Sequence, residues 1–439
     1  MKFITVLFLA LMCSSSLAVL PNYSPAIQGT ARTCDDLIQD YFNLGLTAPE
    51  ITSFLLCVHG IQISLRHSKR VLKRLGCTRC QNRSDLCKIV NAVERELRGS
   101  GGLLGCRAMH QRLVNHHRLV TTREVVCHIL RIFDPEGVQV RLRHRLRRRV
   151  YQCKGPNYLW HVDGYDKLKP FGFCIHRAIG GFSQRILWLE VASSSNDPRI
   201  VAQYYLDCVR QLGGTAYIVQ GDRGTENGSL AAIQHFFCRF AEELTGEKSF
   251  MFGKSTSNQR IEAWWGRLRQ GCAEWWIQFL KDLRDPDLYD NDDVTQHECL
   301  KFCFIDVLQM ELHRVAQEWN LYRIRASNNG KPDIPYFVPE TVDAQDYSCP
   351  FEIDEFEIAE EMCAECPPKK GCSPHFKELA EMIQEDEGLE TPTTAEALKL
   401  YLIYWSTLTP YTPEHRITLF YRITCSISLS ENLSTTSKT

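Results

Sequence analysis

The sequence lacks the compositional extremes that would place it outside the globular proteins. Hydrophobic residues make up 44% and charged residues 23% of the 439-residue chain, which excludes collagen-like, wholly disordered and coiled-coil proteins. Cysteine accounts for only 20 residues, too few for a fold held together by disulfides. Several of these cysteines lie in apolar stretches, where the free thiol packs as a small hydrophobic group in a reducing compartment. The length predicts roughly three domains of about 150 residues.

The chain also has little net charge, a formal −1, because two opposite charges cancel. Residues 61–150 hold 21 Lys and Arg against 6 Asp and Glu, whereas residues 341–390 hold 15 Asp and Glu against 3 Lys. A basic front half of this size predicts contact with a polyanion. Its densest part is a linker over residues 136–155, where six arginines fall within residues 141–149. This segment either neutralises phosphate, as Arg147, Arg148 and Arg149 would, or acts as a localisation signal, or is a solvated linker.

Residues 33–80 predict three short helices. The first runs to about Asn43, Thr47 caps the second and Ser64 caps the third. The third helix carries a basic face made of Arg66, Lys69, Arg70, Lys73 and Arg74. A turn followed by such a helix is typical of the helix-turn-helix, in which the basic helix enters the major groove of duplex DNA. The alternative is a helical bundle with a solvated basic face.

Residues 81–135 predict a second helical DNA-binding module, with helices near residues 86–97, 108–115 and 124–133. Two modules in series would read a longer DNA site than one. Cysteine and histidine residues in and before this segment also suggest half of a zinc site, although another helix separates them. They are Cys77, Cys80, His110, His116 and His117.

From residue 156 to 330 the pattern changes to short strands separated by turn residues, which suits an antiparallel meander followed by alternating helices and strands. Asp163 ends the first strand, Asp222 follows the fourth strand, and Glu262 lies on a later helix. Parallel pairing of the first and fourth strands would place both aspartates at one sheet edge. Three carboxylates there could hold two Mg²⁺ or Mn²⁺ ions, which serve in-line phosphoryl transfer.

Three motifs around these acids resemble the DDE triad of the integrase core, in the animal-genome branch derived from mobile elements. They are Trp160-His-Val-Asp163-Gly, Gly221-Asp222-Arg-Gly-Thr-Glu-Asn and Asn258-Gln-Arg-Ile-Glu262-Ala-Trp-Trp, with a further Trp319-Asn320 and Arg323-Ile324-Arg325 element. The resemblance covers about residues 33–340.

The resemblance implies an α/β, RNase H-like fold, a mixed five-stranded sheet with flanking helices preceded by all-α helix-turn-helix modules. It implies Asp163, Asp222 and Glu262 as catalytic metal ligands, with strand transfer and 3′-end processing of DNA as the ancestral activity. Duplex DNA is the expected partner, and self-association into a homo-oligomer stays open.

The chain departs from the family pattern at two places. It reads Ile179-Gly180-Gly-Phe-Ser-Gln184 where the family has Ile-Asp-Gly-Phe-Ser-Arg, and Leu321 stands where a histidine is expected. It also has no retroviral His-His-Cys-Cys module. The alternative is therefore a domesticated, catalytically silent DNA-binding protein that keeps the fold.

Arginine and tryptophan residues follow Glu262 on the same helix. Arg269 shares its face two turns on and could hold substrate phosphate. The tryptophans either stack on bases or, as we favour, pack in the core: Trp264, Trp265, Trp275 and Trp276.

The acidic tail, residues 331–439, contains a further set of potential metal ligands. Their spacing suits a Cys₃His zinc site made of Cys363, Cys366, Cys372 and His375.

Long apolar runs are nearly absent, and beyond the N-terminus none reaches the roughly 18 residues that span a bilayer. We therefore expect no membrane partner. Residues 1–20 contain one lysine, an apolar run from Phe3 to Met12 and a Ser16-Leu17-Ala18 ending, the pattern of a secretory signal peptide. A buried first helix is the alternative. Because the signal pattern conflicts with DNA binding, we interpret it as a gene-prediction artefact and expect a nuclear protein.

Overall fold

The structure is a computed structural model that describes most of the chain. The described residues are 33–77, 83–143, 153–194, 197–240, 248–253, 259–284, 289–290, 292–324, 330–363, 371–386 and 394–408. Glu262 is described by its backbone alone. Several predicted features lie outside these ranges, namely the signal-like segment, Cys80, Arg147–Arg149, Arg325 and Cys366.

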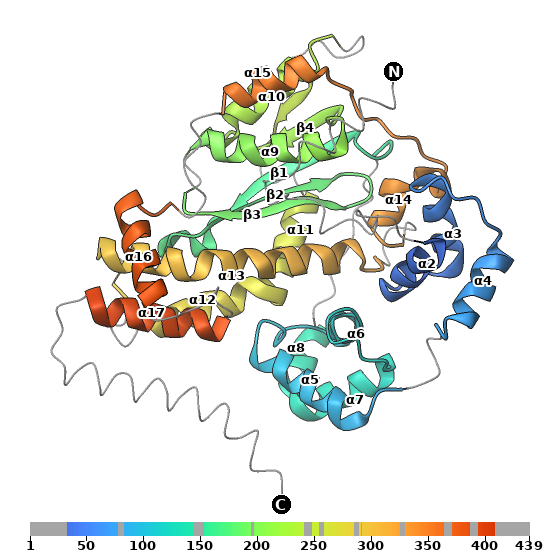
Figure 1. The fold of residues 1–439 in the computed structure, drawn as a ribbon, viewed down its shortest axis with the longest axis horizontal. Coiled ribbons are helices and arrows are strands. Elements are labelled where there is room, and N and C mark those ends of the chain that lie inside the picture. Colours follow the sequence, from blue (N-terminus) through green and yellow to red (C-terminus); the bar gives the residue numbers. More distant parts are fainter. Residues whose placement is uncertain are drawn as a thin grey trace, which may run out of the picture.

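A mixed five-stranded sheet forms the centre of the molecule (Figure 1). Its strands lie in the order β3-β2-β1-β4-β5, with β1 antiparallel to β2, β2 antiparallel to β3, and β4 parallel to both β1 and β5. The bounds are β1 Leu159–Tyr165, β2 Cys174–Gly180, β3 Ile186–Ala192, β4 Ile218–Gly221 and β5 Phe250–Phe252. The predicted meander and the parallel pairing of the first and fourth strands are confirmed. The residue pattern did not predict β5, because a strand of three residues is too short to show a recognisable pattern.

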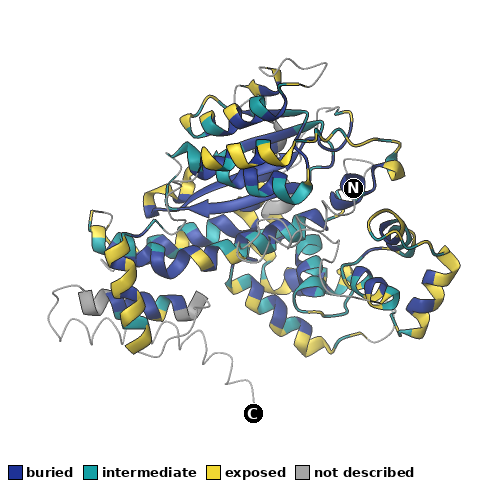
Figure 2. Cartoon of the chain, turned by 45° about the horizontal axis from the view of Figure 1, so that its top comes forward, coloured by how far each residue is buried: buried dark blue, intermediate teal, exposed yellow. Residues whose placement is uncertain are grey.

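Helices cover both faces of this sheet, and every residue of β2 and β3 is buried (Figures 1 and 2). Strands buried on both faces read as continuous apolar runs, as Ile186–Ala192 does. α9 (Pro198–Leu212) and α10 (Gly228–Phe237) lie on one side, and α11 (Gln259–Leu268) and the long α13 (Val294–Asn320) on the other. A π-helical turn, η5 (Arg269–Ala273), joins α11 to α12 (Glu274–Arg284).

The first helical unit consists of α2 (Cys34–Asn43), α3 (Ala48–Cys57) and α4 (Leu65–Arg74). Thr33 and Ser64 cap α2 and α4 through side-chain hydrogen bonds to backbone N–H groups, and Thr47 and Glu50 form a capping box at α3. These are the helices that the sequence predicts. Their apolar faces form a separate core, which also takes in three residues that follow α13, namely Leu321, Ile334 and Val338.

The second helical unit has its own core beneath α5 (Leu86–Arg98), α6 (Cys106–Asn115), α7 (Arg123–Phe133) and α8 (Pro135–Arg143). The three predicted helices are confirmed within two residues at nearly every end. The predicted linker begins as α8, so part of it is helical.

A buried arginine joins this second unit to the sheet domain. Arg112 on α6 is fully buried. Its guanidinium donates to Glu96 (2.8 Å) on α5, to Glu318 (2.9 Å) on α13 and to the Gly271 carbonyl (3.2 Å) of η5. The π-helical turn frees a backbone carbonyl, and Arg112 satisfies it. The contact thus reaches the segment directly after α11.

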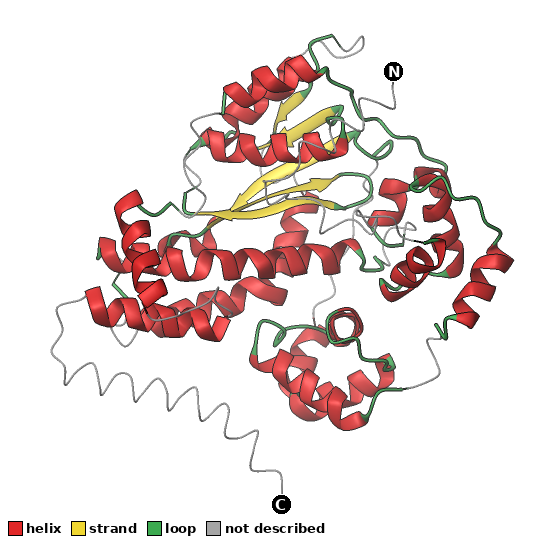
Figure 3. Ribbon diagram, viewed as in Figure 1, coloured by secondary structure: helices red, strands yellow, loops and turns green. Residues whose placement is uncertain are grey.

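The acidic tail forms helices, which Figure 3 draws in red, and several of their side chains are buried in the main core. Its elements are α14 (Asp333–Phe337), α15 (Ile353–Glu361), α16 (Pro374–Asp386) and α17 (Thr394–Leu408). Phe356, Phe376 and Tyr401 are buried in it. The sequence analysis predicted an acidic tail but not these helices, because the many acidic residues mask the pattern of the apolar positions that pack inward.

Candidate functional site

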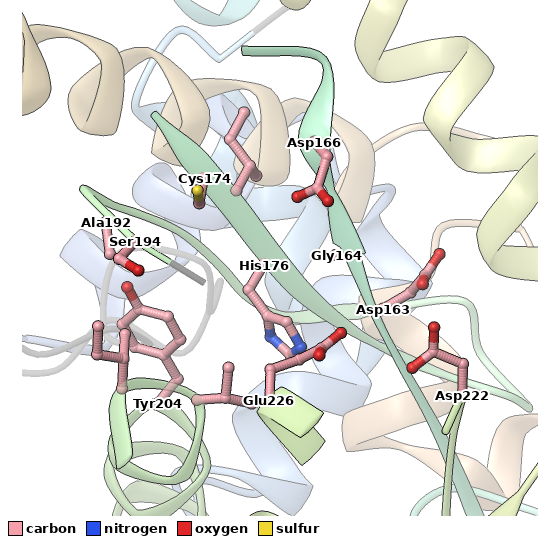
Figure 4. Close-up of a pocket in the computed structure, with 13 residues that line it drawn as sticks. Asp163, Gly164, Asp166, Cys174, His176, Ala192, Ser194, Tyr204, Asp222 and Glu226 are labelled. Carbon is pink, nitrogen blue, oxygen red and sulfur yellow. The ribbon is translucent and has the colours of Figure 1, made fainter. Parts of the chain in front are cut away.

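Asp163 and Asp222 meet at one edge of the sheet. The parallel register pairs Leu159 with Ile218 and His161 with Gln220, so Asp163 and Asp222 come two residues later on their neighbouring strands. Figure 4 shows the two side chains close to each other at this edge. Both line a cavity of about 100 Å³ together with Asp166, His176 and Glu226.

Hydrogen bonds fix the orientation of both carboxylates. Asp163 Oδ2 accepts a bond from the indole Nε1 of Trp265 (2.7 Å). Asp222 Oδ1 accepts from the Gly224 amide (3.0 Å) and from Asn227 Nδ2 (2.8 Å). Donors on α11, on the loop after β4 and on η2 (Thr225–Asn227) therefore hold both acceptors, as a preorganised site requires.

The residue before Asp222 must be small. A Cβ atom at Gly221 would lie 3.0 Å from Val162 Cγ2, 3.1 Å from Phe250 Cζ and 3.2 Å from Asn227 Nδ2. Glycine at this position lets β4 pass between β1 and β5, and this close packing sets where the Asp222 carboxylate emerges.

The Glu262 helix also lies at this edge. α11 contacts β1, and Trp265, one helical turn after Glu262, makes the hydrogen bond to Asp163. The structure therefore brings the α11 backbone beside Asp163. The Glu262 side chain lies outside the described residues, so its carboxylate stays a prediction.

Two acidic residues of the cavity were not singled out from the sequence. Glu226, from η2 (Thr225–Asn227), and Asp166, from η1 (Asp166–Phe171), both line it. Burial raises the pKa of Glu226, and the negative charges of Asp222 and Asp166 raise it further. Glu226 belongs to the same sequence motif as Asp222, and its position four residues after Asp222 is the feature from which its place at the site could have been predicted.

His176 lines the same cavity from β2 and is neutral at pH 7. Burial, followed by the positive charge of the adjacent Arg177, lowers its pKa to about 3. Its Nδ1 accepts a hydrogen bond from Trp188 Nε1 (3.0 Å). The cavity wall on this side is therefore polar but uncharged.

The remaining residues predicted for the Glu262 helix take other roles. Arg269 lies in η5, is exposed and forms an ion pair with Glu274, so its contact with substrate phosphate stays a prediction. Trp264, Trp265 and Trp276 are buried in the main core, which confirms the packing interpretation for them. Trp275 is partly buried and packs against that core.

The Trp319-Asn320 element has a structural role that the sequence did not reveal. Trp319 Nε1 donates to the Gln184 carbonyl (2.6 Å), and the Asn320 side chain bonds both the amide and the carbonyl of Ile186 (2.8 and 3.1 Å). Gln184 adopts a positive φ of 63°. The end of α13 thus stabilises, through hydrogen bonds, the turn that contains Gln184, where this chain departs from the family pattern.

The basic face of α4 is open to solvent. All five of its predicted DNA-contacting residues are exposed, namely Arg66, Lys69, Arg70, Lys73 and Arg74. Arg74 forms an ion pair with Asp35 of α2, and the other four extend the charge along one helix. The opposite face, with Val71 and Leu72, is buried in the first unit.

The described residues do not support either predicted zinc site. No group of three potential ligands among them is arranged to hold a metal ion. Cys363 and Cys372 are buried as members of the main apolar core. His116 and His117 face the carboxylates of Glu318 and Glu96 instead of cysteines. The zinc interpretations therefore have no support in the part of the chain that the structure describes.

The chemistry of the sheet edge suits Mg²⁺ or Mn²⁺. Asp163 and Asp222 offer carboxylate oxygens, the hard donors that these ions prefer, and they emerge from adjacent parallel strands. Asp163 and Asp222, with Glu262 as the third candidate, are the residues that would hold such ions.

The fold and this edge together define the class. A mixed five-stranded sheet of this order, flanked by helices, fits the RNase H-like fold of an integrase core. Residues 150–346 match the family model described as the integrase core domain, so the chain contains an integrase core domain, of the polynucleotidyl transferase type. No curated protein matches the chain. None of the described helices is long and apolar enough to cross a membrane.

Proposed function

We propose that the chain is a DDE-type DNA integrase- or transposase-like enzyme in which Asp163, Asp222 and Glu262 hold two Mg²⁺ or Mn²⁺ ions. The observation that carries the proposal is the β1–β4 register, which brings the two aspartates into one cavity. The hydrogen bond from Trp265 to Asp163 adds support, because it ties the Glu262 helix to the same edge.

In such a site the bound ions activate the attacking oxygen and stabilise the leaving one. The protein residues position the carboxylates for that task. Trp265 holds one oxygen of Asp163, and Gly224 and Asn227 hold one oxygen of Asp222.

DNA binding by the helical units is the second part of the proposal. The exposed basic face of α4 lies on the third helix of a capped three-helix unit, the position of the recognition helix in helix-turn-helix proteins. The segment with Arg147, Arg148 and Arg149 would add phosphate contacts.

The second candidate function is a domesticated, catalytically silent DNA-binding protein. One observation favours it. Fully buried Arg177 stands directly opposite Asp163 on the neighbouring strand, so the edge proposed to bind cations already contains a permanent positive charge.

A divalent-ion-dependent nicking and joining assay on duplex DNA separates the two candidates. We expect activity with Mn²⁺ and its loss in Asp163→Asn and Asp222→Asn, which keep the shape and remove the charge. Asp282→Asn is the matched control, because Asp282 is exposed on α12 and lies outside the cavity lining. Activity that survives in Asp222→Asn would refute the metal site, and inactive but DNA-binding wild-type protein would establish the silent form.

A further inference from the structure

Arg177 is a buried cation within the layer between the sheet and α11. It lies in the middle of β2 and is fully buried. In the antiparallel register its Cα is the partner of the Asp163 Cα, and directly opposite residues of such a pair project on the same face of the sheet. The Arg177 side chain and the Asp163 carboxylate therefore occupy the same layer.

Two tryptophans of α11 enclose the guanidinium. Arg177 Cζ lies 4.2 Å from the ring centroid of Trp264 and 4.5 Å from that of Trp265, both within the range of cation–π attraction. Trp265 also donates its Nε1 hydrogen to Asp163 Oδ2. One indole thus contacts the cation with its face and the carboxylate with its edge.

We propose that Arg177 is a positioning residue, an internal counter-ion that holds the Trp265–Asp163 pair in place without metal and lowers the affinity of the site for divalent ions. This inference rests on the proposed function, because it assumes that Asp163 is a metal ligand. An arginine stays charged at any pH the protein tolerates. Its repulsion of an incoming divalent ion is weakly screened in a buried layer.

If Arg177 had a purely structural role, replacing it should affect Mn²⁺ binding no more than replacing another buried arginine that packs against aromatic rings. Arg185, at the start of β3, provides that comparison. It is also buried, its Cζ lies 4.9 Å from the Tyr336 ring and 4.8 Å from the Phe337 ring, and it pairs with Asp333 (2.8 Å). Neither Arg185 nor its partners line the cavity.

The experiment measures the Mn²⁺ dissociation constant of the full chain by isothermal titration calorimetry, without DNA. The variants are Arg177→Met, which keeps an apolar chain between the indoles, Arg177→Lys, which keeps the charge, and Arg185→Met as the matched control. Because the chain has eight tryptophans, the fluorescence change during the titration is compared with that of Trp265→Phe to show whether the ion arrives next to the Trp265 indole. Arg177→Gln replaces Arg177→Met if the latter fails to fold.

We expect Arg177→Met to bind Mn²⁺ on the order of ten- to a hundredfold more tightly than the wild type, and Arg177→Lys and Arg185→Met to bind like the wild type. An unchanged constant in a folded Arg177→Met protein, or an equal change in Arg185→Met, would overturn the inference and leave the proposed metal site standing. Absence of Mn²⁺ binding in every variant would overturn both.

Discussion

Replacing Arg112 by methionine should weaken the contact between the second helical unit and the integrase core and lower the free energy of unfolding. The guanidinium is fully buried and joins Glu96 and Glu318, whose side chains are 8% and 14% exposed. Methionine fills much of the same volume but leaves two carboxylates without their shared cation. Removing one partner of a buried ion pair costs about 3–5 kcal/mol.

The pKa of Glu96 gives a second value for the free energy that the buried charge cluster around Arg112 contributes to folding. Burial alone raises this pKa, but the hydrogen bond with His117 and the charge and hydrogen bond of Arg112 outweigh it and lower the pKa from 4.5 to about 2. At about 1.4 kcal/mol per pH unit, that fall corresponds to about 3 kcal/mol. Because the folded pKa is depressed, this stabilisation is complete above about pH 4.5 and is lost as the pH falls toward 2.

Chemical denaturation at pH 7 and at pH 3 tests this expectation. Arg112→Met should lose about 3–5 kcal/mol at pH 7 and less at pH 3, because the stabilisation from ionised Glu96 is already partly lost below about pH 4.5. The control is Arg98→Met, because Arg98 pairs with Glu94 (2.6 Å) on the exposed surface of the same unit. Such a pair contributes below about 0.5 kcal/mol. Equal losses in the two variants would refute the structural role of Arg112.

Three further predictions concern DNA, packing and location. Combining Arg66→Gln, Lys69→Gln and Arg70→Gln should reduce the slope of log affinity against log salt by up to about 3; an unchanged slope would exclude α4 as the DNA contact. Gly221→Ala should cost about 1–3 kcal/mol of stability in thermal unfolding, because the added Cβ overpacks against Val162, and a neutral effect would contradict that packing. In cell fractionation we expect the full-length chain in the nucleus, and secretion with loss of residues 1–20 would contradict this.

Local sequence signals predicted most of the elements that carry the site. Thr47 and Ser64 predicted two helix starts, and short apolar runs separated by turn residues predicted β1 to β3. Asp163 and Asp222 could be placed at one edge because strand ends and parallel pairing are local and topological properties. Once the first and fourth strands were assumed to pair, the 58 residues that separate the two aspartates in the sequence did not affect this prediction.

The interactions that sequence could not predict depend on distant partners. Arg112 lies within a basic segment and looks like a DNA contact, yet Glu318, some two hundred residues later, buries it. Arg177 gives no periodic signal, because both faces of β2 are covered. The tail cysteines have zinc-like spacing, but spacing does not show that Cys363 and Cys372 pack in an apolar core.

The most direct test of the metal site is anomalous diffraction from crystals of the full chain soaked in Mn²⁺. We predict two anomalous peaks about 3.5–4 Å apart, both within coordination distance of Asp163 or Asp222 and at least one of them bound by Glu262. A single peak elsewhere, or a Glu262 side chain that points away from occupied density between the two aspartates, would rule out the proposed two-ion site.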